Sequence, residues 1–202
     1  MLLLALDTSA NMVSVALLDE DRVWGFVQED MERGHAENLM PIIARLMESA
    51  QMTLKEIDGI AVSVGPGSFT GVRVGLAAAR AFGLALKIPV YGVTCFESVV
   101  FGIHKPVAVV LDTKRDDFYV QFFDENAKAC SVPAVQSAEQ LQQKLPFTAV
   151  GSGALKLSEE IGCPIIQKIS PVAVSIGKVA LSRLDNPMPA DPLYLRDADV
   201  TL

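Results

Sequence analysis

The sequence predicts an α/β protein built from two similar halves, each a mixed β-sheet with flanking helices, divided near residue 104. Its 202 residues are 50% hydrophobic with a formal net charge of −7, which suits one domain or two small ones. Short β-rich runs are interspersed with segments of helical periodicity. In addition, residues 4–19 align without gaps to residues 109–124. Together these observations favour a duplicated fold.

The internal repeat is the most informative of the three observations. Each copy reads as a strand, an Asp-Thr turn and a return strand, and most other aligned pairs are apolar. A duplication predicts one lobe at residues 1–104 and a second at residues 105–202; the alternative is a chance similarity of two β-hairpins. The identical pairs are Leu6 and Leu111, Asp7 and Asp112, Thr8 and Thr113, Val15 and Val120, and Asp19 and Asp124.

The first half opens with three strands, expected at Leu2–Leu6, Val13–Leu18 and Val23–Gln28. Their short connections predict an antiparallel meander. A helix over residues 36–50 follows, with Pro41 close enough to its first turn to be tolerated. Its apolar residues repeat at helical spacing: Leu39, Ile42, Ile43, Leu46 and Met47.

The rest of the first half alternates strands and helices. Capping boxes at residues 53–56 and 94–97 predict a single helical turn and a helix reaching about Ile103. Buried strands are expected at Ile60–Val64 and Val90–Val93, with a helix at Val72–Leu86 between them.

The second half restarts the pattern after Pro106. Strands are expected at 107–111, 118–123, near 130–135 and at 147–150, with a helix capped by residues 137–140. Ser170 and Pro171 predict an N-cap and first helical residue of a helix reaching about Leu184. Three prolines after Asn186 predict an extended tail.

The two Asp-Thr turns are candidate anion sites, because small turn residues let backbone N–H groups face an anion. The first turn, at residues 7–11, is small enough for this role. The second, at residues 112–117, has no glycine, carries long side chains and contains further acids that would repel phosphate. At both turns the alternative is an aspartate that bonds to its own turn.

The densest motif is the glycine-rich loop GPGSFTG between a strand and a helix. It matches neither GxxxxGK[ST] nor GxGxxG nor GxSxG, so none of those chemistries is assigned. An anion or partner site and a plain tight turn remain equally open. The loop consists of Gly65, Pro66, Gly67, Ser68, Phe69, Thr70 and Gly71.

The helix at residues 72–86 carries only two charges, Arg73 and Arg80, and its other residues are small or apolar. A surface helix has a polar face, so this helix must be covered on more than one side, by its own domain or by another chain. With the 36–50 helix it forms the expected partner-binding surface. The residues assigned to that surface are Leu39, Ile43, Met47, Arg73, Val74, Ala77, Arg80, Ala81 and Leu84.

Other classes of protein find little support. His35 and His104 lie too far apart for a helical metal motif, and no cysteine lies near a histidine, so no catalytic, cofactor or metal residues are assigned. The three cysteines, Cys95, Cys130 and Cys163, predict reduced, buried thiols in a cytoplasmic protein. No apolar stretch is long enough for a membrane span, and the acidic balance disfavours a broad nucleic-acid surface.

Four segments together resemble the bacterial TsaB (YeaZ) family. They are LLLALDTSANMVSVALLD, GHAENLMPII, IDGIAVSVGPGSFTGVRVGLAAARAFGLAL and the terminal PLYLR, and they span the chain in order. The resemblance implies a duplicated actin-like (ASKHA, ribonuclease H-like) fold, in agreement with the repeat. It also implies a role in the biosynthesis of threonylcarbamoyladenosine in tRNA.

The resemblance further implies a non-catalytic scaffold or activator that works with the catalytic subunit TsaD and the ATPase TsaE on adenosine 37. ATP or ADP and metal are then expected on the partner subunits, tRNA contact only through the complex, and a homodimer when the chain is alone. His35 has no second histidine on its helix, which fits loss of the metal site of the catalytic relative. The alternatives are a stand-alone ATPase or small-molecule kinase of the same fold, and a metallopeptidase.

Overall fold

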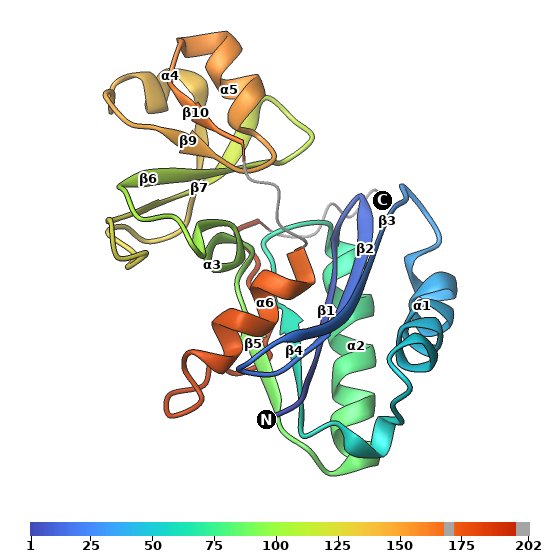
Figure 1. The fold of residues 1–202 in the computed structure, drawn as a ribbon. Coiled ribbons are helices and arrows are strands. Elements are labelled where there is room, and N and C mark those ends of the chain that lie inside the picture. The colour runs from blue at the N-terminus through green and yellow to red at the C-terminus, as the bar shows by residue number, and fades with distance from the viewer. Residues whose placement is uncertain (168–171, 197–202) are drawn as a thin grey trace. The chain divides into compact units, whose positions relative to one another are not determined.

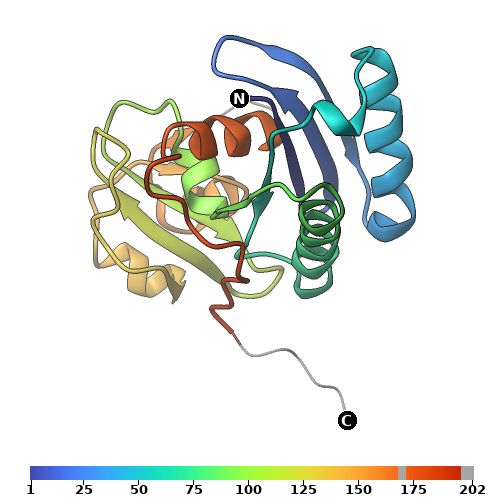
Figure 2. The same cartoon turned by 90° about the horizontal axis from the view of Figure 1, so that it is seen from below.

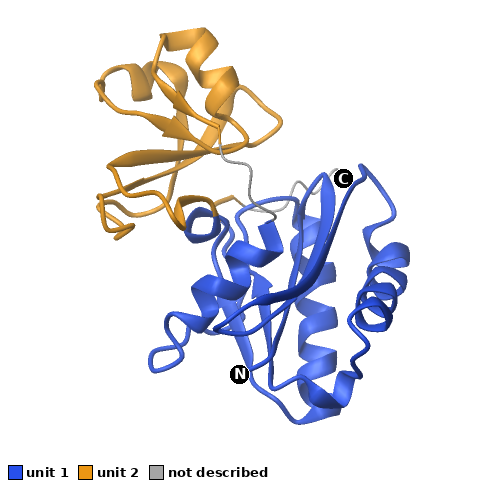
Figure 3. Ribbon diagram, viewed as in Figure 1, with its two compact units in different colours: residues 1–98, 170–194 blue, residues 99–169, 195–202 orange. Residues whose placement is uncertain are grey.

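The computed structural model describes residues 1–167 and 172–196 and divides the chain into two compact units. Unit 1 comprises residues 1–98 and 170–194, and unit 2 comprises residues 99–169 and 195–202 (Figure 3). The elements of the first unit are β1 (Leu3–Ala10), β2 (Met12–Leu18), β3 (Val23–Asp30), α1 (His35–Ser49), η1 (Leu54–Glu56), β4 (Gly59–Ser63), α2 (Phe69–Leu86), β5 (Val90–Val93), α3 (Cys95–Val100), which crosses the boundary, and α6 (Val172–Leu181).

The sheet of unit 1 has the order β3-β2-β1-β4-β5 (Figure 1). β1, β2 and β3 form the antiparallel meander that the short connections predicted. β4 joins β1 in parallel after the helix α1 that follows β3, and β5 joins β4 in parallel after the helix α2. The strand predicted at residues 60–64 is β4, one residue earlier at each end.

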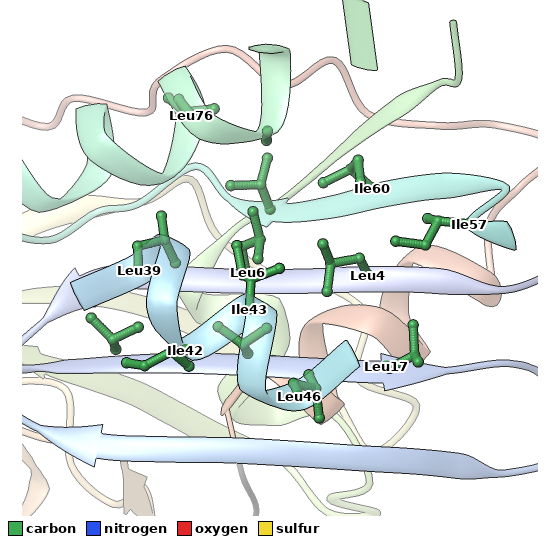
Figure 4. Packing of buried hydrophobic residues seen from close by; sticks show 14 of the residues in the cluster. Leu4, Leu6, Leu17, Leu39, Ile42, Ile43, Leu46, Ile57, Ile60 and Leu76 are labelled. Atoms are coloured by element: carbon green, nitrogen blue, oxygen red, sulfur yellow. The ribbon is translucent and has the colours of Figure 1, made fainter. Parts of the chain in front are cut away.

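The main core lies between this sheet and the helices α1 and α2. Both helices cover one face, and α6 covers the other (Figures 1 and 2). Figure 4 shows side chains of α1 meeting alternate residues of β1 and β2, as the two-residue period of a strand requires. The labelled residues of this core are Leu4, Leu6, Leu17, Leu39, Ile42, Ile43, Leu46, Ile57, Ile60 and Leu76.

Unit 2 repeats the same topology. Its elements are β6 (Val107–Asp112), β7 (Asp117–Phe123), β8 (Ala134–Ser137), α4 (Ala138–Gln142), β9 (Ala149–Val150), α5 (Ala154–Ile161) and β10 (Ile165–Ile166). The sheet order is β10-β9-β6-β7-β8, with β6, β7 and β8 antiparallel and β9 and β10 parallel. Read from β8, each strand corresponds in position and direction to one of unit 1, so the two halves form the predicted duplicated fold.

The unit boundaries differ from the two predicted lobes. The sequence analysis assigned everything after residue 105 to the second lobe, whereas α6 and the tail up to Tyr194 belong to unit 1. The N–H groups of Val172 and Ala173, at the start of α6, donate to the side-chain oxygens of Gln28 and Ser14, 3.1 Å away in each case. Because β2 and β3 supply these acceptors, α6 is held by long-range partners that local sequence does not reveal.

Local signals at the helix ends were read correctly at three places. In the capping boxes, Glu56 accepts hydrogen bonds from Thr53, Glu97 from Thr94 and Gln140 from Ser137.

Some element bounds differ from the prediction. Pro41 lies inside α1, which begins at His35, and α2 begins at Phe69, before the predicted residue 72. The strand expected near 130–135 is β8, and the sequence analysis did not predict α5 or β10. The predicted cap at Ser170 and Pro171 lies outside the described residues.

Candidate functional site

The glycine-rich loop packs directly on the turn that ends β1. A Cβ atom at residue 67 would lie 2.3 Å from the carbonyl oxygen of Ser9, and one at residue 71 would lie 2.0 Å from that of Thr8. The Ser68 N–H donates to the Ser9 carbonyl over 2.7 Å, and the Thr8 hydroxyl donates to the Gly71 carbonyl over 2.7 Å. The two motifs singled out from sequence therefore form one structure.

These contacts explain two glycines of the loop by backbone approach alone. Gly65 has a φ of 96°, a left-handed conformation that favours glycine. Ser68 is the N-cap of α2, and its side chain accepts from the Gly71 N–H. The sequence left open two interpretations of the loop, an anion or partner site and a tight strand-to-helix turn. The tight turn accounts for the spacing of the glycines.

A buried polar cluster lies beneath the loop. Asp7 Oδ1 accepts from the Ser9 N–H at 2.9 Å and from the Ser9 hydroxyl at 2.6 Å. Cys95 Sγ lies 3.2 Å from Ser9 Oγ and 3.1 Å from Ser63 Oγ. Asp7 is 2% exposed, so its carboxyl group faces the interior of unit 1. The sequence reading of Asp7 as an aspartate that bonds its own turn matches this geometry.

Burial determines the proton affinities in this cluster. Burial raises the pKa of the Asp7 carboxyl above its ordinary value, and the hydrogen bonds from Ser9 oppose the shift. Burial, reinforced by the neighbouring Asp7 charge, raises the pKa of the Cys95 thiol to about 12. A thiol with that pKa is protonated at neutral pH, and the thiolate is the nucleophilic form. Cys95 is therefore a packing residue of this cluster.

The predicted partner-binding residues divide into two groups. Leu39, Ile43 and Met47 are buried in the core of unit 1, because α1 turns this stripe toward the sheet. Assigning them to a surface contact was therefore wrong, and Val74 is half-buried against the same core. Arg73, Ala77, Arg80, Ala81 and Leu84 are exposed along α2, with Leu84 exposed by 83%.

The exposed stripe of α1 was missed. It contains Ala36, Met40, Pro41 and Ala44, which lie between the buried positions. Met40 is 50% exposed, so this stripe presents a large apolar side chain to solvent. The apolar residues at helical spacing from Leu39 to Met47 indicated the core-facing side of α1. The apolar residues of the same helix that fall outside this spacing could have indicated its exposed side.

Comparison with known proteins decides the family. The family model of "TsaD: tRNA N6-adenosine threonylcarbamoyltransferase" matches residues 12–184. The TsaB protein of Buchnera aphidicola subsp. Schizaphis graminum, a tRNA threonylcarbamoyladenosine biosynthesis protein, is 34% identical over 83% of this chain and 86% of its own length. The chain belongs to the TsaB (YeaZ) family. An uncharacterised Mycobacterium tuberculosis protein is also 34% identical, over 83% of this chain and 77% of its own length.

Solved structures agree with this assignment. YeaZ from Pseudomonas aeruginosa has a TM-score of 0.79 and 26% identity, covering 96% of this chain and 99% of its own. A Clostridium difficile dehydratase activator, with a TM-score of 0.58 and 10% identity, shares the fold alone. These neighbours confirm the predicted actin-like fold. This TsaB-family chain therefore belongs to a family of tRNA threonylcarbamoyladenosine biosynthesis proteins.

The second Asp-Thr turn of this TsaB-family chain is crowded with side chains. Asp112 Oδ1 accepts from the Lys114 N–H at 2.9 Å, so this aspartate also bonds its own turn. The ammonium groups of Lys114 and Lys156 lie 3.3 Å and 4.0 Å from the Asp112 carboxylate. These contacts engage the carboxylate within the chain.

The histidines and the apolar helix can also be placed. His35 Nε2 lies 2.9 Å from the Ala10 carbonyl oxygen, and within the described residues no group of three potential metal-ligating side chains occurs.

The helix α2, whose 18 residues have a mean hydropathy of 1.3, is long and apolar enough to cross a membrane, judged by length and composition alone. The sequence prediction had excluded such a segment. Because Val72, Leu76 and Ala79 lie in the core of unit 1, α2 is a helix of the folded domain.

Proposed function

We propose that this chain is a non-catalytic scaffold and activator of the threonylcarbamoylation of adenosine 37 in tRNA. It acts in the cytoplasm with the catalytic subunit TsaD and the ATPase TsaE, which carry the nucleotide and metal chemistry. The observation that carries this proposal is the geometry of the glycine-rich loop in a chain of this family. The loop approaches the backbone of β1 closely, and the Asp7 carboxyl beneath it faces inward.

The outer face of α2 supports a binding role. Ala77 and Ala81 are exposed on the same face as Leu84, and small residues let a neighbouring helix approach closely. An apolar stripe left on the surface marks a protein interaction site more often than chance. We assign the TsaD contact to this stripe, together with the outer stripe of α1, and the contact between two copies to the same surface when TsaD is absent.

Charge supports an indirect role for tRNA. The chain has 17 basic and 24 acidic residues, whereas tight binding of a polyanion needs several clustered cations. We propose that the other subunits hold most of the tRNA. A tight, salt-sensitive complex between tRNA and this chain alone would contradict that assignment.

The deciding experiment is reconstitution with TsaD and TsaE from the same organism. Transfer of the threonylcarbamoyl group to adenosine 37 is measured with and without this chain, and co-purification with TsaD is measured separately. Modification should depend on this chain, and the two proteins should co-purify. Catalytic turnover of ATP by the isolated chain would instead favour the alternative of a stand-alone ATPase or small-molecule kinase of the same fold.

A further inference from the structure

Residues 188–194, here called the strap, run in an extended course along the edge of the first sheet. The Gly92 N–H donates to the Met188 carbonyl at 2.9 Å, and the Leu193 N–H donates to the Val64 carbonyl at 2.8 Å. β5 is the edge strand of this sheet, and an uncovered edge strand invites pairing with other chains. The strap therefore makes one main-chain hydrogen bond to this edge strand, at Gly92, and a second to Val64, the residue after β4.

The strap also engages both arginines of α2. The guanidinium of Arg80 donates to the Ala190 carbonyl at 2.7 Å and to Asp191 Oδ1 at 2.8 Å. Arg73 Nε donates to the Tyr194 hydroxyl at 3.0 Å. The Arg73 guanidinium carbon lies 3.7 Å from the centre of the Phe69 ring, and the Phe69 and Tyr194 rings lie 5.0 Å apart.

Two glycines make room for the strap. A Cβ atom at residue 92 would lie 2.2 Å from the Pro189 carbonyl oxygen, which real Cβ atoms do not do. A Cβ atom at residue 65 would lie 3.2 Å from the Leu193 carbonyl oxygen. The position of the strap is therefore encoded by residues far from it in sequence.

We infer that the strap completes the partner-binding surface of α2, so that partner affinity depends on residues 188–194. This inference rests on the proposed function. A guanidinium that loses water at an interface needs another hydrogen-bond acceptor. The strap supplies acceptors to Arg73 and Arg80 before the partner arrives, so the partner can present an uncharged helix face.

The strap borders the apolar stripe and does not cover it. Ala77, Ala81 and Leu84 remain exposed beside it. This geometry argues against an inhibitory strap that would block the surface until it is displaced. It predicts instead that loosening the strap lowers the affinity for the partner. An inhibitory strap would give the opposite sign.

The principal test is Gly92→Ala in the full chain. Its new methyl group cannot coexist with the Pro189 carbonyl, so the strap should move while the surface of α2 is unchanged. Binding to TsaD should weaken by about tenfold, the effect expected when an interface residue that contributes to affinity is displaced. Hydrogen exchange at the Leu193 N–H should accelerate in the same variant, which reports strap release directly.

Two further variants serve as control and second test. Gly59→Ala makes the same change in the same sheet, but the three atoms nearest its methyl group belong to the side chains of Met1, Leu3 and Tyr91 and not to the strap, so binding should stay within about twofold of the wild type. Tyr194→Ala removes a ring that is 40% exposed and outside the core, so it tests the strap without threatening the fold. Tyr194→Phe keeps the ring and should retain part of the affinity.

The outcomes separate the two proposals. If wild-type chain and TsaD do not associate, the proposed function fails and the strap inference fails with it. If they associate but Gly92→Ala and Tyr194→Ala bind as tightly as the wild type, or more tightly, only the strap inference is overturned.

Discussion

Asp7 and Asp112 begin identical Asp-Thr pairs on corresponding strands, β1 and β6, yet they lie on opposite faces of their sheets. Leu4 and Leu6 of β1 face the core under α1 and α2, so Asp7 faces the other side. Ala108 and Val110 of β6 face the corresponding core under α4 and α5, and Asp112 shares their side. The two aspartates of the identical dipeptides therefore lie in different environments, Asp7 on the face away from α1 and α2 and Asp112 on the face covered by α4 and α5.

The difference arises from a register shift between Asp7 and Ala10 in the β1–β2 hairpin, which adds one residue to the segment after Asp7. Asp7 pairs with Ser14 across residues 8–13, whereas Asp112 pairs with Phe118 across residues 113–117, one residue fewer. A shift of one residue moves a strand's side chains to the other face. The gapless alignment is thus structurally correct for the return strands, where Val15 and Val120 both lie in cores, and displaced by one residue in the first strands.

The charge-insertion variant Ala77→Glu tests the partner surface. Ala77 is exposed, so the variant should fold with a free energy of unfolding within about 0.5 kcal/mol of the wild type. At an interface the carboxylate would lose its water, at a cost of several kcal/mol, so TsaD binding and self-association should both be lost. Leu155→Glu, at an exposed position of α5, is the matched control and should bind normally. Normal binding by Ala77→Glu would place the contact elsewhere.

The variant Gly71→Ala tests the close approach of α2 to β1. In an ordinary helix this change stabilises by up to about 1 kcal/mol. Here the new Cβ would lie 2.0 Å from the Thr8 carbonyl oxygen, so the protein should lose more than about 2 kcal/mol of stability in urea unfolding. In Gly75→Ala the nearest atom is the Thr8 hydroxyl oxygen at 2.7 Å, a side-chain atom that can move if its hydrogen bond to the Gly71 carbonyl is given up, so this variant should cost less than Gly71→Ala. A stabilised Gly71→Ala variant would refute the packing.

The variant Asp7→Asn tests the raised pKa of the buried carboxyl. A carboxyl whose folded pKa is raised binds its proton more tightly when folded, so its contribution to stability is present below the ordinary pKa and is lost as pH rises through the folded pKa. Asn keeps an oxygen for the Ser9 donors without the charge. At pH 7 the variant should therefore be the more stable protein, by about 1.4 kcal/mol for each unit of pKa rise.

Urea unfolding of Asp7→Asn and wild type from pH 3 to pH 8 provides the measurement. The advantage of the variant should disappear below about pH 4, where the wild-type carboxyl is protonated in both states. A difference that does not change with pH would show that the Asp7 carboxyl has an ordinary pKa.

The three cysteines should differ in reactivity. Cys130 is exposed, so the expectation of three buried thiols was wrong for this residue. Cys95 and Cys163 are buried, and burial raises the pKa of both thiols. Iodoacetamide at pH 8 should therefore modify Cys130 in the folded chain and the other two only after unfolding. Peptide mass spectrometry identifies the sites, and a Cys130→Ser chain should show no rapid phase. Rapid modification of Cys95 would contradict the buried cluster.

The isolated chain should bind ATP weakly or not at all. The second Asp-Thr turn contains Lys114, Arg115, Asp116 and Asp117 and no glycine, so backbone N–H groups are poorly placed to face phosphate. Calorimetric titration with Mg-ATP measures the affinity. The variant Asp116→Asn, which removes one repelling charge, should bind no worse than the wild type. A low-micromolar Kd for the wild-type chain would overturn this expectation.

Local sequence determined much of each half of this protein. Apolar runs and short connections specified the meander of β1, β2 and β3, and the capping boxes placed η1, α3 and α4, because these signals act between residues close along the chain. The low polarity of α2 predicted cover on more than one side, but unit 1 buries one face of this helix and leaves Ala77, Ala81 and Leu84 exposed, so cover of that face by another chain stays a prediction. The glycine-rich loop could be located by its composition, although its chemistry could not be read from its spacing.

Tertiary structure alone decided which surfaces remain exposed to solvent. The return of α6 to unit 1 depends on acceptors in Ser14 and Gln28, more than 140 residues away. In the sequence, Arg73 and Arg80 are two charges on an apolar helix with no evident partner. In the structure they donate hydrogen bonds to Tyr194 and Asp191 of the strap. Burial and hydrogen bonding are properties of the assembled chain, so contacts between distant residues are invisible to patterns of a few residues.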